Sequence, residues 1–200
     1  KVSSDAAQSI RSLIVTLGSD QMIMEIQEPR PCPYCGAPNE SASRVSSHEI
    51  YFPDELRMST TAVPLGVLLR AHFEGRDLAN MRCRVCDVNN DIQTQMTITG
   101  LPNILVLTLA RFNADNSKLE TPIDVPIIFD LREYAQVVGE EESVYQLVSV
   151  VHHYLGGHFV TDYFHPEEMQ WYHANDSRVG PIDGPERIGK TPYILVYTKI

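Results

Sequence analysis

The hydrophobic residues of this chain alternate with polar ones more often than they recur at helical spacing. Residues 12–17 are rich in β-formers, and Met22, Met24 and Ile26 then alternate with polar neighbours after a turn at residues 18–20. This pattern predicts a β-hairpin over residues 12–27. Similar runs predict extended segments at residues 49–56, 94–99, 104–112, 125–128, 145–153, 158–164, 168–175 and 193–199.

Helical periodicity is confined to short stretches. Leu65, Leu68, Leu69 and Phe73 fall on one face of a helix predicted over residues 64–73, and Gly75 is expected to end it. A second short helix is expected within residues 130–138. The predicted fold class is therefore α+β, with a mainly antiparallel sheet and few helices.

Composition adds the expectation of a buried core. The 200 residues are 43% hydrophobic and 21% charged, which is typical of a globular protein. No apolar run approaches the roughly 18 residues that a membrane-spanning helix needs, and residues 1–7 are polar where a signal peptide would become apolar. We therefore expect neither a membrane anchor nor a membrane partner.

The formal net charge of −10 argues against nucleic acid as a binding partner. Nucleic-acid binding draws its affinity from cationic groups that displace counterions from phosphates, so this chain is not expected to bind DNA or RNA. A basic or apolar protein surface fits the charge better.

The four cysteines form two Cys-x-x-Cys pairs, Cys32/Cys35 and Cys83/Cys86. Two such pairs supply the four thiolates of a tetrahedral zinc site, and a site with four protein ligands is structural because it has no open position. The alternatives are two local disulfides or buried free thiols. A zinc site indicates a reducing compartment, so we expect the cytoplasm or the nucleus.

A second candidate site lies near the C-terminus. His158 follows two glycines and begins a predicted strand, and Asn175 and Asp176 end the next one. An imidazole oriented through Nδ1–H by a carboxamide or carboxylate leaves Nε2 free to take the proton of a thiol nucleophile. A structural or surface role is the ordinary alternative for any one of the seven histidines.

Motifs along the whole chain resemble those of the ubiquitin-specific protease family. They occur in the family's order, from the segment after the second cysteine pair to the closing strand: residues 101–112, 125–134, 145–153, Gly157-His158-Phe159, residues 171–179 and residues 192–197. The resemblance implies zinc-ribbon fingers over residues 13–100 and the palm sheet of a papain-like cysteine protease over residues 101–200. It also implies a catalytic base at His158, an orienting residue at Asn175 and a polar helper at Asp176.

Two departures from the family pattern bear on activity. The thumb segment with its glycine-asparagine-threonine-cysteine box is absent from the 200 residues, and all four cysteines are assigned to zinc. The glycine-rich loop before His158 is also short. We expect the fingers and palm of a deubiquitinase that hydrolyses the bond after the C-terminal glycine of ubiquitin, with a nucleophilic cysteine from a segment outside this chain.

Two alternatives remain at the level of sequence. The first is a catalytically inactive scaffold that binds ubiquitin, a ubiquitin-like protein or another protein. The second is a zinc-ribbon module of a nucleic-acid machine.

Overall fold

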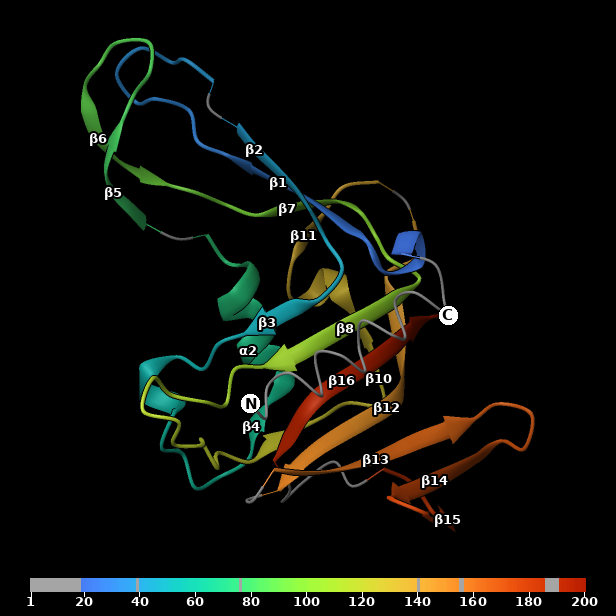
Figure 1. Ribbon diagram of the computed structural model, residues 1–200. Helices are drawn as coiled ribbons and strands as arrows, with labels where there is room; N and C mark the ends of the chain where they lie inside the picture. Colours follow the sequence, from blue (N-terminus) through green and yellow to red (C-terminus); the bar gives the residue numbers. More distant parts are fainter. Residues whose placement is uncertain (1–18, 39, 76, 140, 155–156, 186–190) are drawn as a thin grey trace.

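The computed structural model describes residues 19–38, 40–75, 77–139, 141–154, 157–185 and 191–200. A large eight-stranded sheet forms the body of the molecule, and a four-stranded sheet extends from it toward a separate two-stranded hairpin (Figure 1). Within the described residues no helix is long and apolar enough to cross a membrane.

The large sheet has the strand order β15-β14-β13-β12-β16-β8-β3, with β10 also paired to β12. Its strands are β3 (His48–Ile50), β8 (Ile104–Leu109), β10 (Ile128–Asp130), β12 (Val144–Tyr154), β13 (His158–His165), β14 (Gln170–Asn175), β15 (Arg178–Ile182) and β16 (Pro192–Lys199). All pairs are antiparallel except β3 with β8, which is parallel. Burial alternates along the first half of β12, where one side chain in two faces the core, and the alternation breaks where the register with β16 shifts.

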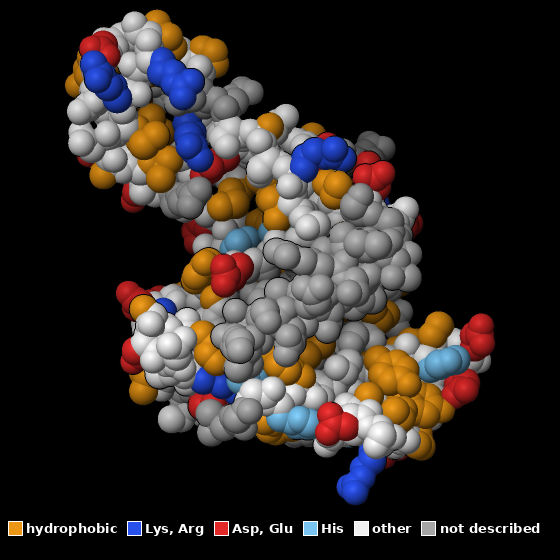
Figure 2. Space-filling model, viewed as in Figure 1, with side chains coloured by type: hydrophobic (Ala, Val, Ile, Leu, Met, Phe, Trp, Pro, Cys, Tyr) orange, Lys and Arg blue, Asp and Glu red, His pale blue; other side chains and the backbone are white. Residues whose placement is uncertain are grey.

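The four-stranded sheet, in the order β11-β7-β1-β2, and the β5–β6 hairpin together form a projecting arm. Their strands are β1 (Met24–Pro29), β2 (Glu40–Val45), β5 (Asp77–Arg82), β6 (Asn89–Gln93), β7 (Thr97–Gly100) and β11 (Gln136–Val137). A short parallel pair, β4 (Val63–Pro64) with β9 (Ile123–Asp124), forms a separate two-stranded sheet. Figure 2 shows the arm standing away from the body, with a hollow between them.

The sequence predicted the helix correctly and the details of several strands incorrectly. The helix α2 (Leu65–Phe73) buries Leu65, Leu68, Leu69 and Phe73. Two short 3-10 helices, η1 (Ser19–Met22) and η2 (Asp54–Leu56), replace the turn expected at 18–20 and the end of the extended segment 49–56. The short helix expected within 130–138 is the 3-10 helix η3 (Leu131–Glu133). The first half of the predicted hairpin at 12–27 lies outside the described residues.

Strands β2, β5, β6 and β15 were not predicted from the sequence. Strands β5 and β6 are short and mostly polar, with Asn80 at a φ of 57° where the register shifts. Hydrophobic alternation therefore gives little signal there. Residues 125–127, expected as part of a strand, lie between β9 and β10.

Arg111 stabilises the junction after β8 in a fully buried position. Its side chain donates to the carbonyls of Pro192, Leu119 and Thr121 at 2.6, 2.9 and 2.9 Å. Burial lowers the pKa of the guanidinium to about 10, which leaves it charged at neutral pH.

His48 makes the fold sensitive to acid. It lies on β3 beside His72, and burial followed by the neighbouring His72 lowers its pKa to about 4. Because the folded state favours the neutral imidazole, His48 stabilises the fold fully above about pH 6.5 and progressively less as the pH falls toward 4. We expect its contribution to the free energy of unfolding to drop by about 2 kcal/mol between pH 7 and pH 5.

Urea denaturation of the wild-type chain and of His48→Gln, at pH 7 and pH 5, measures this contribution. The variant should lose less stability over the interval, whereas His165→Gln in the β13–β14 hairpin should behave like the wild type. Equal losses for all three proteins would contradict the assignment to His48.

Candidate functional site

The four cysteines converge at the far end of the arm. The Sγ atoms of Cys32, Cys35, Cys83 and Cys86 all lie within 4.8 Å of one another. The Cys32–Cys86 and Cys35–Cys83 sulfur pairs are each 3.7 Å apart. A tetrahedron with Zn–S bonds of about 2.3 Å has edges of about 3.8 Å, whereas a disulfide needs sulfurs about 2.05 Å apart. The distances fit zinc, and all four cysteines are free.

The two cysteine pairs are built as matching turns. In the first, the Gly36 N–H donates to the Cys32 carbonyl at 2.9 Å, and in the second the Asp87 N–H donates to the Cys83 carbonyl at 3.0 Å. Gly36 and Asp87 both have left-handed φ values, 66° and 61°. Gly36 adopts this conformation without strain, and an aspartate tolerates it better than most residues.

The same turns aim backbone N–H groups at sulfur. The N–H groups of Cys86 and Val85 lower the pKa of Cys83 to about 6, and the N–H of Cys35 is the main cause that lowers the pKa of Cys32. The N–H of Val88 lowers the pKa of Cys86, but burial and the other thiols outweigh it and raise that pKa to about 12. Zinc binds cysteines as thiolates, and its charge would offset the repulsion among four of them held this close together.

His158 and Asn175 lie side by side on the large sheet. His158 begins β13 and Asn175 ends β14, and His158 Nε2 is 2.8 Å from Asn175 Oδ1. Both side chains are partly exposed. The distance falls inside the range that a base and its orienting residue need.

The ring nitrogen that faces Asn175 is not the expected one. Nδ1 was expected to face the orienting residue, whereas the structure places Nε2 there. The β13–β14 register pairs Thr161 with Ala174, so Asn175 lies opposite residue 160, one diagonal step from His158. A diagonal neighbour is about 7–8 Å away, and Nε2, the nitrogen farther from the backbone, spans that gap. Nδ1 is then the nitrogen left for a reacting group.

Asp176 and His153 form no hydrogen bond with His158 in the described residues. Asp176 is exposed at the turn after β14, with a φ of 51°. His153 pairs with Phe159 and lies on the opposite face of the sheet from His158. Its ring packs among Phe112, Phe159 and Tyr193.

A neighbouring histidine–aspartate network was not predicted from the sequence. Asp162, which is 1% exposed, accepts from His173 Nδ1 at 2.6 Å and lies 3.4 Å from His152 Nε2. Strand alternation places this network on the same sheet face as His158 and Asn175. Its three members lie on three different strands, so no local sequence signal marks it.

Comparison with known proteins relates this arrangement to one family. The family model described as "Ubiquitin carboxyl-terminal hydrolase" matches residues 42–197. Ubiquitin carboxyl-terminal hydrolase 8 of Saccharomyces cerevisiae is 29% identical over 135 residues, covering 60% of this chain and 28% of that protein. Ubiquitin carboxyl-terminal hydrolase 2 of Gallus gallus is 33% identical over 122 residues, covering 58% and 34%.

A solved structure shares the fold. The SAGA Ubp8/Sgf11/Sus1/Sgf73 DUB module bound to ubiquitin aldehyde contains a chain that superposes with a TM-score of 0.71 at 23% identity. The match covers 90% of this chain and 41% of that one, so the chain spans well under two thirds of its relatives. The family match over residues 42–197 is decisive, and the chain belongs to the ubiquitin carboxyl-terminal hydrolase family, in its ubiquitin-specific protease branch.

Proposed function

We propose that this chain forms the fingers and palm of a ubiquitin-specific deubiquitinase, with residues 13–100 as fingers, apart from β3 and α2, which pack with the large sheet, and residues 101–200 as palm. The observation that carries the proposal is the 2.8 Å contact between His158 and Asn175 in a chain of this family. The partner is ubiquitin or a ubiquitin-like protein, a choice supported by the similar DUB module, which was solved with ubiquitin aldehyde bound. The reducing cytoplasm or nucleus suits the four thiols.

In this proposal His158 is the general base and Asn175 is its positioning residue. Asn175 Oδ1 accepts a hydrogen bond from Nε2–H, which fixes the tautomer and leaves the Nδ1 lone pair to take the proton of a cysteine thiol. The thiolate attacks the carbonyl carbon of the C-terminal glycine of ubiquitin. The His158 imidazolium then returns the proton to the leaving lysine amine, and water hydrolyses the thioester. Asp176, next to Asn175, is the polar helper.

The nucleophile is supplied by a segment outside this chain. The sequence holds four cysteines and all four lie in one cluster that could hold a metal ion, so in this proposal none is left for attack. Zinc bound there would hold the turns of the arm together. A site closed by four thiolates leaves no position for substrate, so the metal is proposed as structural.

The proposal predicts that the isolated 200 residues do not hydrolyse a fluorogenic ubiquitin amide above the uncatalysed rate. A base without a nucleophile is left with slow attack by water. A fluorescence time course with the zinc-loaded chain measures the rate of release of the fluorophore, and the His158→Ala chain is the matched control. Rapid turnover that survives His158→Ala would contradict both the assigned base and the external nucleophile.

A non-catalytic scaffold is the second candidate, favoured by the commitment of every cysteine to one cluster. The two candidates predict different results when this chain is joined to a cysteine-bearing thumb segment. Turnover there supports the enzyme. Binding of ubiquitin without turnover supports the scaffold.

A further inference from the structure

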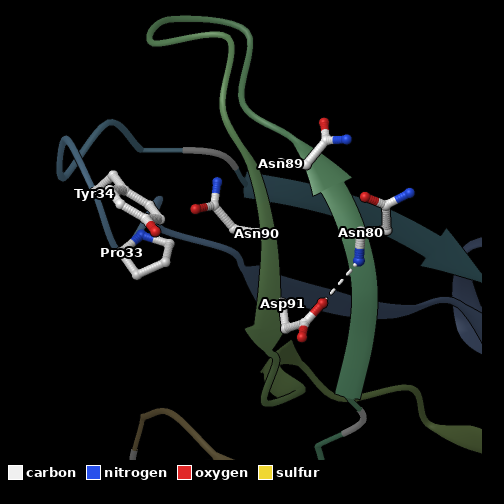
Figure 3. A pocket seen from close by; sticks show the side chains of 6 residues that line it. All are labelled: Pro33, Tyr34, Asn80, Asn89, Asn90 and Asp91. Atoms are coloured by element: carbon white, nitrogen blue, oxygen red, sulfur yellow. Dashed lines mark hydrogen bonds between the residues drawn. The ribbon is translucent and has the colours of Figure 1, made fainter.

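A pocket lies beside the cysteine cluster at the far end of the arm. Its volume is about 280 Å³, and it is lined by Pro33 and Tyr34 from the first cysteine turn and by Asn80, Asn89, Asn90 and Asp91 from the β5–β6 hairpin. Figure 3 shows the Asn90 amide extending from its strand toward the turn that carries Tyr34. We propose that this pocket binds an arginine side chain of a partner protein.

Asn90 supplies a hydrogen-bond acceptor that the fold does not use. The residue is 5% exposed, and its Nδ2 group donates to the Val88 carbonyl at 2.9 Å and to Cys32 Sγ at 3.7 Å. Because Nδ2 donates to two acceptors, the orientation of the amide is fixed, and Oδ1 points away from the Val88 carbonyl and the Cys32 sulfur. Among the described residues Oδ1 has no hydrogen-bond partner. Buried polar atoms normally have one; because less than 1 Å² of this oxygen is exposed, a donor in the pocket must displace neighbouring atoms to reach it.

The remaining lining groups favour a cation over a neutral donor. Asp91 contributes a carboxylate whose Oδ1 already accepts from the Asn80 N–H at 2.9 Å, which orients the group. None of the six described lining residues is Lys or Arg, so nothing in the lining neutralises Asp91. The negative charge and the amide oxygens together favour a positively charged donor.

Tyr34 selects arginine among cations. Its side chain is 73% exposed, an unusual exposure for a large aromatic residue. A planar guanidinium stacks on such a ring and still presents several N–H donors to separate oxygens, whereas an ammonium is a compact point charge. The pocket therefore combines an aromatic face, a carboxylate and amide acceptors, which is the chemistry that recognises arginine.

The test is a titration of the zinc-loaded chain with three blocked tripeptides, Gly-Arg-Gly, Gly-Lys-Gly and Gly-citrulline-Gly, followed by two-dimensional NMR. The arginine peptide should shift the side-chain amides of Asn80, Asn89 and Asn90 with a Kd in the millimolar range. The lysine peptide should bind more weakly, and citrulline, which keeps the shape but not the charge, should bind about tenfold more weakly or worse.

Variants locate the site. Asp91→Asn keeps the acceptor for the Asn80 N–H but removes the charge, and we expect affinity to fall about threefold to tenfold. Tyr34→Ala should weaken binding and Tyr34→Phe should preserve it. Asp77→Asn, at the other end of β5 and outside the pocket, is the matched control and should bind as the wild type does. Zinc content and backbone shifts confirm that each variant is folded.

Several results would overturn the proposal. They are no binding of the arginine peptide, equal binding of the citrulline peptide, shifts confined to another surface, or equal losses in Asp91→Asn and Asp77→Asn. None of these measurements involves turnover, so they test the arginine site independently of the proposed deubiquitinase activity.

Discussion

If the proposed function holds, replacing His158 with alanine in a protein that joins this chain to a cysteine-bearing thumb segment is expected to lower kcat/KM on a fluorogenic ubiquitin amide by about 10³-fold or more. Without the His158 imidazole no general base remains, because the Asn175 carboxamide cannot take the thiol proton. Asn175→Ala should cost about 10²-fold, because the base stays but its ring is no longer held in one orientation. The two effects should not add, since both act through one imidazole.

The orienting role of Asn175 has a sharper signature than a loss of rate. Asn175→Asp keeps an acceptor for His158 Nε2–H and should recover much of the activity lost in Asn175→Ala. It should also raise the pKa of the imidazole, because a carboxylate stabilises the imidazolium, and so move the acidic limb of the pH–rate profile upward. A purely structural role for Asn175 would not move that limb.

Controls separate this pair from its surroundings. His165→Gln, in the same hairpin but away from Asn175, should leave kcat/KM nearly unchanged. Asp176→Ala should have a smaller effect than Asn175→Ala, because Asp176 is an exposed turn residue. An unchanged rate in His158→Ala would refute the assigned base, and a larger loss in Asp176→Ala than in Asn175→Ala would reassign the orienting residue.

The sequence revealed the groups whose signal is local. Cys-x-x-Cys spacing is set within one turn, so the approach of the two pairs was predicted from four residues. The helix α2 was predicted for the same reason, since Leu65, Leu68, Leu69 and Phe73 must share one face wherever the helix lies. The strands that begin at His158 and end at Asn175 were also predictable from their alternation.

What could not be predicted depends on register between distant strands. The facing nitrogen of His158 follows from a one-step diagonal offset between β13 and β14, which the sequence does not encode locally. The Asp162 network likewise requires knowing that β12, β13 and β14 are neighbours. The polar β5–β6 hairpin is held beside the cysteine cluster, so its order does not come from a hydrophobic face that a pattern could detect.

Removing zinc is expected to unfold the arm's tip and leave the large sheet intact. The β5–β6 pair is a separate two-stranded sheet with mostly exposed side chains, and such a hairpin is marginally stable alone. Structural zinc contributes about 10–16 kcal/mol in zinc-finger peptides. The main hydrophobic core contains none of the four cysteines, so its packing does not need the metal.

Cys83→Ser, in which one ligand is lost from the buried side of the cluster, tests this expectation. Zinc content should fall from one ion per chain to a small fraction. Amide exchange should become fast in β5, β6 and residues 30–38 and stay slow in β12 and β16. Val85→Ala is the matched control, because Val85 lies between the ligands of the same turn but is 74% exposed and contributes no sulfur. A full zinc complement in Cys83→Ser would rule out the four-thiolate site. Loss of protection throughout the large sheet would instead show that the two parts of the molecule unfold as one unit, since only shared stability would carry the loss from the arm to β12 and β16.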